Sequence, residues 1–283
     1  MKFKLPDFDL SKYPKVYAGG RDRHATATAV SFVDENTILV ASFLNKKIFL
    51  IDIRGDIKII SEIETNHYPD LMDYKDGLII ISNRSDGERF GGVSLFRLNG
   101  NEITHIKDVV IKKLKQVHGC RIIDDNNIVF TNTEDKYRGC YFMNLNTEET
   151  TSINNFKYYP KDVLIMGARM LIVTSSSRPS SFGKVIETGS FLYLFEYPSL
   201  KEITNIQFFG QTDCITVSGN NGFITFQAQD SLFHFKIEND ILTNLGTIPN
   251  FNFPHGVASL NDKIIVTNYG DNSIDILNIT DLI

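Results

Sequence analysis

Hydrophobic and polar residues alternate along most of this chain, in runs of five to eight residues that are rich in Ile, Val, Phe and Tyr. Asn, Asp and Gly bound these runs. A period of two is typical of β-strands, because successive side chains of a strand point to opposite faces. Helical periodicity is almost missing, since its best candidate, residues 109–115, is short and rich in β-branched residues. The pattern therefore predicts an all-β protein.

One strand recurs six times along the chain, and each copy ends on Ser, Asn or Gln. The copies read TILVAS (37–42), LIIISN (78–83), NIVFTN (127–132), MLIVTS (170–175), FITFQ (223–227) and KIIVTN (263–268). A further strand follows each copy, as KIFLIDI (47–53), VSLFRL (93–98), CYFMNL (140–145), FLYLFEY (191–197), SLFHFKI (231–237) and SIDILNI (273–279). A period of ~40–50 residues with about four strands per unit is typical of β-propellers.

We therefore predict a single six-bladed β-propeller with four-stranded blades. The predicted blades are residues 22–66, 67–115, 116–156, 157–209, 210–251 and 252–283 plus 15–20. A fourth strand follows in five units, but the sixth unit ends at Ile283 without one. The strand-like segment KVYAGG (15–20) is expected to pair beside the third strand of the last unit. This N-terminal strand would close the ring and leave no open sheet edge there.

The composition agrees with a folded protein, because 42% of the 283 residues are hydrophobic and 22% are charged. The N-terminus lacks the apolar core of a signal peptide and no apolar run reaches ~18 residues, so we expect a cytoplasmic protein without a membrane partner. The three cysteines form no CxxC pair and predict reduced thiols. A net charge of −5 argues against nucleic-acid binding.

The last unit, FPHGVASLNDKIIVTNYGDNSIDIL (253–277), resembles an NHL-type repeat, and VHGCRIIDDNNIVFTN (117–132) is similar to it. Such repeats occur in six-bladed propellers related to peptidylglycine amidating lyase, virginiamycin B lyase and the SMP30 lactonase group. The resemblance covers all six units as a pattern, and His-Gly occurs in two of them. It implies a lyase or hydrolase with a metal ion in the central channel, although a fold does not fix a function.

Candidate site residues follow from the repeat, because the inner strand of each blade lines the channel. Counting back 13 or 14 residues from the last residue of each second strand reaches the start of each inner strand. The positions are Thr28, Asp70, His118, Asp162, Asp213 and His255. We expect these side chains to converge at one mouth of the channel, where imidazoles and carboxylates are suited to general acid–base catalysis.

We assign the catalytic role to His118, His255, Asp162 and Asp213. A divalent cation (Ca, Mg or Zn) bound by His118, His255 and Asp213 is a second hypothesis, because imidazole and carboxylate are common metal ligands. The alternative is that these residues hold channel waters and hydrogen-bond to neighbouring blades. Cys120 and Cys214, close to this ring, are expected to be small buried hydrophobes.

Substrate contacts are expected from the same mouth, because the connections from second to third strands lie there and include the long segments 84–92, 133–139 and 175–189. The candidate substrate-binding residues are Asp70, Thr28, Arg84, Arg178, Tyr68, Tyr159, Asn268 and Asn132. Arginines suit an anionic group, and tyrosines suit a sugar or peptide, although tyrosines also pack between blades.

Two functions remain open on the sequence alone. The first is an enzyme, a lyase or hydrolase acting on a small ligand at the channel mouth with metal or His/Asp assistance. The second is a non-catalytic propeller that binds a protein, peptide or glycan through loops of the same face.

Overall fold

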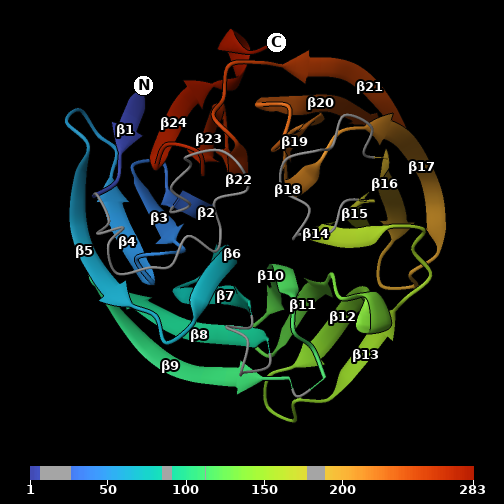
Figure 1. The fold of residues 1–283 in the computed structure, drawn as a ribbon, viewed down its shortest axis with the longest axis horizontal. Helices are drawn as coiled ribbons and strands as arrows, with labels where there is room; N and C mark the ends of the chain where they lie inside the picture. The colour runs from blue at the N-terminus through green and yellow to red at the C-terminus, as the bar shows by residue number, and fades with distance from the viewer. Residues whose placement is uncertain (7–26, 85–90, 112, 177–188) are drawn as a thin grey trace.

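The computed structural model describes residues 1–6, 27–84, 91–111, 113–176 and 189–283. Within them, six four-stranded antiparallel sheets form a ring around a central channel (Figure 1). Each sheet is one blade, and its first strand is innermost. This confirms the predicted all-β, six-bladed propeller.

The strands follow the chain order within each of the first five blades, and the sixth takes its outer strand from the N-terminus. The first three blades are β2 (Ala27–Asp34), β3 (Thr37–Ser42), β4 (Lys47–Asp52) and β5 (Lys58–Glu64); β6 (Tyr68–Lys75), β7 (Leu78–Arg84), β8 (Gly92–Asn99) and β9 (Glu102–Val110); and β10 (Val117–Asp124), β11 (Asn127–Asn132), β12 (Gly139–Asn144) and β13 (Thr150–Ile153). The next two are β14 (Tyr159–Met166), β15 (Arg169–Ser175), β16 (Gly189–Glu196) and β17 (Glu202–Phe209); and β18 (Thr212–Ser218), β19 (Asn221–Phe226), β20 (Ser231–Glu238) and β21 (Ile241–Ile248). The sixth blade contains β22 (Pro254–Leu260), β23 (Lys263–Asn268), β24 (Ser273–Asn278) and β1 (Lys2–Lys4).

The core lies between neighbouring blades. Second strands such as β3 and β23 are buried on both faces after their first residue, whereas the outer strand β21 is mostly exposed. The hydrophobic cluster containing Leu39 of the first blade also contains Ile79 of the second and Ile264 of the sixth. Each fully buried aliphatic side chain of this kind contributes about 1.5–3 kcal/mol, so blade-to-blade packing holds the ring rigid around the channel.

The ring is closed from the N-terminus, as predicted, but by a different segment. Strand β1 pairs antiparallel with β24, with Lys2 opposite Asp275. The predicted closing segment, residues 15–20, lies outside the described residues. Phe3 and Leu5 pack into the cluster between the sixth and first blades, and the Leu5 amide donates to the Asn272 carbonyl at 2.9 Å. Burial of these two side chains explains why such a short strand suffices.

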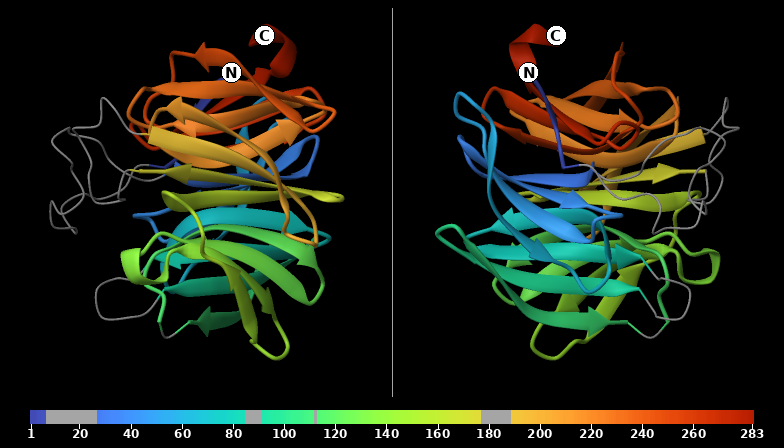
Figure 2. Two further views of the ribbon diagram at one scale, coloured as in Figure 1. Left: turned by 90° about the vertical axis from the view of Figure 1, so that its right-hand side faces the viewer. Right: turned by 60° about the vertical axis from the view of Figure 1, so that its left-hand side comes forward.

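Seen from the side, the six blades form a thick disc, and both chain ends lie at the same part of its rim (Figure 2). No helix in the described part of the chain is long and apolar enough to cross a membrane.

Candidate functional site

A β-bulge near the start of each inner strand positions the candidate site. In the second blade, Pro69 pairs with Asn83 and Met72 with Ile81, so two inner residues lie opposite Ser82. The other inner strands have an equivalent shift of register. The first residue of each bulge is Thr28, Asp70, His118, Lys161, Asp213 or His255. A bulge bends its strand and redirects a side chain, which places these six residues at one level of the channel.

The residue at this level in the fourth blade is Lys161, whereas the fixed count predicted Asp162. Lys161 is 2% exposed and follows Pro160, just as Asp70 follows Pro69 and His255 follows Pro254. A count of 13 residues back from Ser175 reaches Asp162, whereas the count of 14 that applies in the first and third blades reaches Lys161. Alignment on these prolines would have found it.

Asp162 lies one residue deeper and is engaged in other contacts. Arg121 Nη2 donates to its Oδ2 at 2.6 Å, and the Ile215 amide donates to the same oxygen at 3.0 Å. Asp162 is therefore not among the residues that contact the histidines. Sequence reasoning also missed Arg121, whose side chain is buried within the channel.

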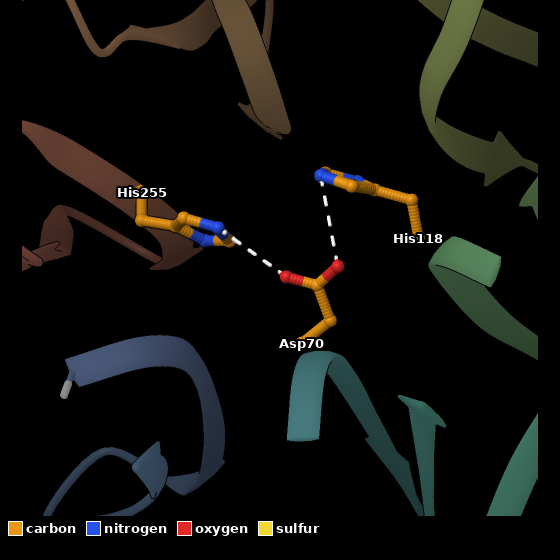
Figure 3. Close-up of side chains that lie close together, drawn as sticks. All are labelled: Asp70, His118 and His255. Carbon is orange, nitrogen blue, oxygen red and sulfur yellow. Dashed lines mark ion pairs between the residues drawn. The ribbon is translucent and has the colours of Figure 1, made fainter. Parts of the chain in front are cut away.

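Two histidines and two aspartates meet in the channel. Asp213 bridges the imidazoles, with Oδ1 2.8 Å from His118 Nε2 and Oδ2 2.8 Å from His255 Nε2. Figure 3 shows Asp70 opposite both rings, 3.3 Å from His255 Nε2 and 3.8 Å from His118 Nε2. All four side chains are at most 2% exposed. Four of the six predicted ring residues therefore form one cluster.

The other ring nitrogen of each histidine is fixed by the next blade. His118 Nδ1 lies 2.9 Å from the Lys161 carbonyl oxygen, and His255 Nδ1 lies 2.9 Å from the Thr28 carbonyl oxygen. A carbonyl oxygen only accepts, so each Nδ1 must carry a proton and donate it. Each Nε2 then faces the carboxylates either as a lone pair or as a second N–H, and this choice decides the chemistry of the cluster.

Hydroxyl groups of the second strands hold these bulges together. Thr131 Oγ1 accepts from the Gly119 amide at 2.8 Å and donates to the Lys161 carbonyl at 2.8 Å. Thr267 Oγ1 accepts from the Gly256 amide at 2.7 Å and donates to the Thr28 carbonyl at 3.0 Å. The carbonyl that orients each histidine is thus itself held by a buried threonine.

Steric crowding explains why a glycine follows each of the two channel histidines. A Cβ on Gly119 would lie 2.6 Å from Asp162 Cα, and a Cβ on Gly256 would lie 2.5 Å from the Thr28 carbonyl oxygen. Only glycine lets the next blade approach closely enough for its carbonyl to reach the imidazole. The two His-Gly pairs in the sequence mark these two contacts.

Charges in the cluster shift two pKa values strongly. Burial by itself raises the pKa of Asp213, but the adjacent His118 and His255 hold it well below its usual range. Burial by itself lowers the pKa of His255, but Asp213 and Asp70 raise it to about 9. Gln227 Nε2 also donates to Asp213 Oδ2 at 2.8 Å and fixes that carboxylate. Without a metal ion, His255 is therefore an imidazolium at neutral pH.

The donor set fits a divalent cation. Asp70, His118 and His255 each offer one ligand atom, all within 4.8 Å of one another, and Asp213 contacts both imidazoles. Metal–ligand bonds of about 2.0–2.1 Å place neighbouring donors about 2.9–3.4 Å apart, and the N···O distances of 2.8, 2.8, 3.3 and 3.8 Å span this range. Within the part of the chain that the structure describes, His118 Nε2 lies 2.8 Å from Asp213 Oδ1 but has no hydrogen-bond partner of suitable geometry.

The predicted substrate-binding residues occupy varied positions. Thr28 Oγ1 lies 3.2 Å from the Ala41 carbonyl oxygen and 3.3 Å from the Pro69 carbonyl oxygen, so it links two blades. Asn132 Nδ2 donates to the Tyr137 carbonyl at 2.8 Å, and Asn268 Nδ2 donates to Asp275 Oδ2 at 2.7 Å. These three side chains are fully buried and brace loops and blades.

The two predicted aromatic contacts, Tyr68 and Tyr159, begin the inner strands of the second and fourth blades. Tyr68 stacks on Phe43 at 4.9 Å, with Lys46 Nζ 4.2 Å from its ring centre. Tyr159 donates a hydrogen bond to Asp135 on the segment after β11. Arg178 lies outside the described residues, and the position of the Arg84 side chain is also outside them.

The cysteines behave as small buried residues, as expected. Cys120 and Cys214 are at most 4% exposed, and burial raises the pKa of both thiols well above the usual value.

Comparisons with known proteins support the fold. No family model matches the chain, and no curated protein matches it. Among solved structures, virginiamycin B lyase from Staphylococcus aureus is similar with a TM-score of 0.61 at 13% identity over 98% of each chain. Hydrazine synthase from Kuenenia stuttgartiensis has a TM-score of 0.61 at 9% identity, over 91% of this chain and 96% of the other. A Bacteroides thetaiotaomicron protein of unknown function has a TM-score of 0.59 at 12% identity, over 90% and 70%.

The chain thus has the propeller fold of the structures that include virginiamycin B lyase, in agreement with the resemblance of its repeats. At these identities the similarity concerns the fold alone.

Proposed function

We propose that this propeller is a metal-assisted lyase or hydrolase that acts on a small ligand at the channel mouth. His118, His255, Asp213 and Asp70 would hold one divalent cation. The observation that carries the proposal is the orientation of the histidines: each Nδ1–H is donated to a backbone carbonyl, so each Nε2 is directed at buried carboxylates. A neutral imidazole in this position presents a lone pair, the form in which histidine binds metals.

The charges and ligand types favour a transition metal. Two carboxylates balance the charge of a divalent cation. Charge balance is needed because an unpaired ion is costly to bury. Two imidazoles favour Zn or Fe over Ca and Mg, which prefer oxygen ligands. A bound cation would polarise an oxygen of the substrate as a Lewis acid.

The protein groups have separate tasks in this proposal. The Lys161 and Thr28 carbonyls hold the two imidazoles in one tautomer, and Gln227 holds Asp213. This support keeps the donors in place before a ligand arrives, so little reorganisation is needed. The fold shared with a protein named virginiamycin B lyase makes lyase chemistry the first class to test, and lactone hydrolysis the second.

Metal content tests the site. The protein, purified without a His tag, stripped with chelator and reloaded with Zn, Mn, Mg or Ca, should retain one Zn per chain after gel filtration. His118→Ala and His255→Ala should each retain less than about a tenth of that amount, since ligand loss weakens binding by at least 10–100-fold. His234→Ala is the matched control, because His234 lies in the third strand of its blade, β20, and contacts Asn221 of β19, away from the channel. Absence of stoichiometric metal in the reloaded protein would overturn the metal site.

Turnover tests the reaction class separately. A panel of lactones and cyclic depsipeptides should include substrates that the Zn-loaded protein opens and that the chelated protein and His118→Ala do not. If the metal binds but no member of either class reacts, the reaction class is wrong while the metal site stands.

A further inference from the structure

A second site lies deeper in the channel than the histidine cluster. A cavity of about 260 Å³ is lined by residues from the inner strands of all six blades. On β6 and β22, for example, it borders Leu71–Tyr74 and Val257–Leu260, which follow the cluster residues Asp70 and His255 along the chain. Because a cavity of about 150 Å³ accommodates benzene, this one has room for a small organic molecule.

Arg121 gives this cavity a positive group with unused hydrogen-bonding capacity. Arg121 is only 8% exposed. Nη1 donates to the Cys120 carbonyl at 2.8 Å, and Nη2 donates to Asp162 Oδ2 at 2.6 Å and the Ile215 carbonyl at 3.1 Å. A guanidinium has five N–H donors, so two of them have no acceptor among the residues that the structure describes. Arg121 lines the cavity, so these donors are available there to an acceptor on a ligand.

Asp73 gives the same cavity a negative group. Its Oδ2 accepts from the Ile122 amide at 2.8 Å, next to Arg121 in β10. Burial raises its pKa, and the charge of Arg121 opposes that effect, so the two groups are electrostatic neighbours. Yet within the described ranges the ion pair of Arg121 is with Asp162, and none forms with Asp73. An opposite-charge pair therefore borders one cavity without closing on itself.

Aliphatic and polar groups contribute about equally to the lining of the cavity. Met72, Leu164, Val217 and Val257 border the cavity, and its polar contribution beyond the charged pair includes the Thr216 and Ser259 hydroxyls, 2.8 Å apart. A ligand that satisfies this lining must be small, carry both charges close together and have an apolar remainder. A simple anion would face Asp73, and a simple cation would leave the two remaining N–H groups of Arg121 without an acceptor.

We propose that this cavity binds a small aliphatic zwitterion, of the chemical class of free L-leucine. The ligand carboxylate accepts from Arg121, the ammonium group donates to Asp73, and the side chain packs on the aliphatic lining. The site uses none of the histidine cluster residues, so it is separate from the proposed metal centre.

Isothermal titration with three probes tests the proposal on the full chain. L-leucine should bind saturably at millimolar or lower concentration. Leucinol lacks the carboxylate and N-acetyl-L-leucine lacks the ammonium group, so each should bind at least about tenfold more weakly, the loss of one charge-assisted contact. Absence of L-leucine binding, or equal binding of all three probes, would overturn the proposal.

Variants locate the site. Ser259→Leu fills the cavity without removing a charge and should abolish binding, and Asp73→Asn should weaken it at least about tenfold. Thr243→Leu, at an exposed position on the outer strand β21, is the matched control and should bind like the wild type. His118→Ala should also bind L-leucine normally, which separates this site from the metal centre. Wild-type binding by a folded Ser259→Leu protein, or loss of binding in His118→Ala, would refute the location.

Discussion

Replacement of Thr267 by Val tests whether the buried hydroxyls of the second strands hold the channel together. Thr267 is fully buried in β23, where it accepts from the Gly256 amide and donates to the Thr28 carbonyl of the first blade. Valine has nearly the same shape, so the substitution leaves no cavity. Its effect is therefore on hydrogen bonding between the sixth and first blades.

The magnitude follows from the groups left behind. The Gly256 amide loses its acceptor, and an orphaned buried donor costs about 1–3 kcal/mol. The Thr28 carbonyl keeps its contact with His255 Nδ1 at 2.9 Å and is not orphaned. The added methyl regains up to about 0.8 kcal/mol through burial. We expect a net loss of about 1–2 kcal/mol in the free energy of unfolding.

Urea unfolding of the chelated protein measures this loss, as a lower midpoint with an unchanged slope. Thr243→Val, at an exposed position on β21, is the control and should stay within about 0.5 kcal/mol of the wild type. If Thr267→Val is as stable as Thr243→Val, the hydroxyl does not brace the bulge and the reasoning is wrong.

Three further predictions concern the same channel. Gly256→Ala should destabilise the protein by more than about 2 kcal/mol in urea unfolding, because its Cβ would lie 2.5 Å from the Thr28 carbonyl oxygen; a variant of wild-type stability would show that the blades separate freely. In the metal-free protein, folding raises the pKa of His255 from about 6.5 to about 9. Protonated His255 therefore contributes its full stabilisation to the free energy of unfolding below pH 6.5, and this stabilisation is lost as the pH rises through 9. The stability gap between wild type and His255→Asn should shrink over that window in urea titrations, and a constant gap would contradict it. Iodoacetamide should label Cys120, Cys140 and Cys214 only after unfolding, because burial raises the pKa of each thiol. Rapid labelling of the native protein would refute this prediction.

The sequence predicts the fold more fully than the site, for a physical reason. Each strand appears in the sequence as a run of alternating hydrophobic residues, so six repeats predict six blades. The missing fourth strand of the last repeat predicts closure of the ring by an N-terminal strand. The identity of the closing strand did not follow, because β1 has only three residues and is specified by the burial of Phe3 and Leu5 against other blades.

Within the site, the count along the chain found both histidines, Asp70 and Asp213 but placed Asp162 where Lys161 lies. The distance from the bulge to the end of the second strand is 13 residues in some blades and 14 in others, and the hydrophobic pattern does not say which applies in the fourth blade. The two carbonyls that fix the histidine tautomers are backbone groups of other blades. These carbonyls reach the imidazoles because neighbouring blades approach closely at Gly119 and Gly256. The pattern of residues along the chain does not reveal how close two blades come.

The short closing strand also determines how the protein responds to pulling. Met1 and Ile276 exchange two backbone hydrogen bonds, so β1 begins beside the end of β24 from which the chain continues to Ile283. A force applied between the two termini therefore acts on the same end of this strand pair. Its hydrogen bonds must break one after another, as in a zipper, and never all together in shear. Packing of Phe3 and Leu5 holds the closing strand in place, but a pull on the two ends of the chain breaks the hydrogen bonds of this strand pair one at a time.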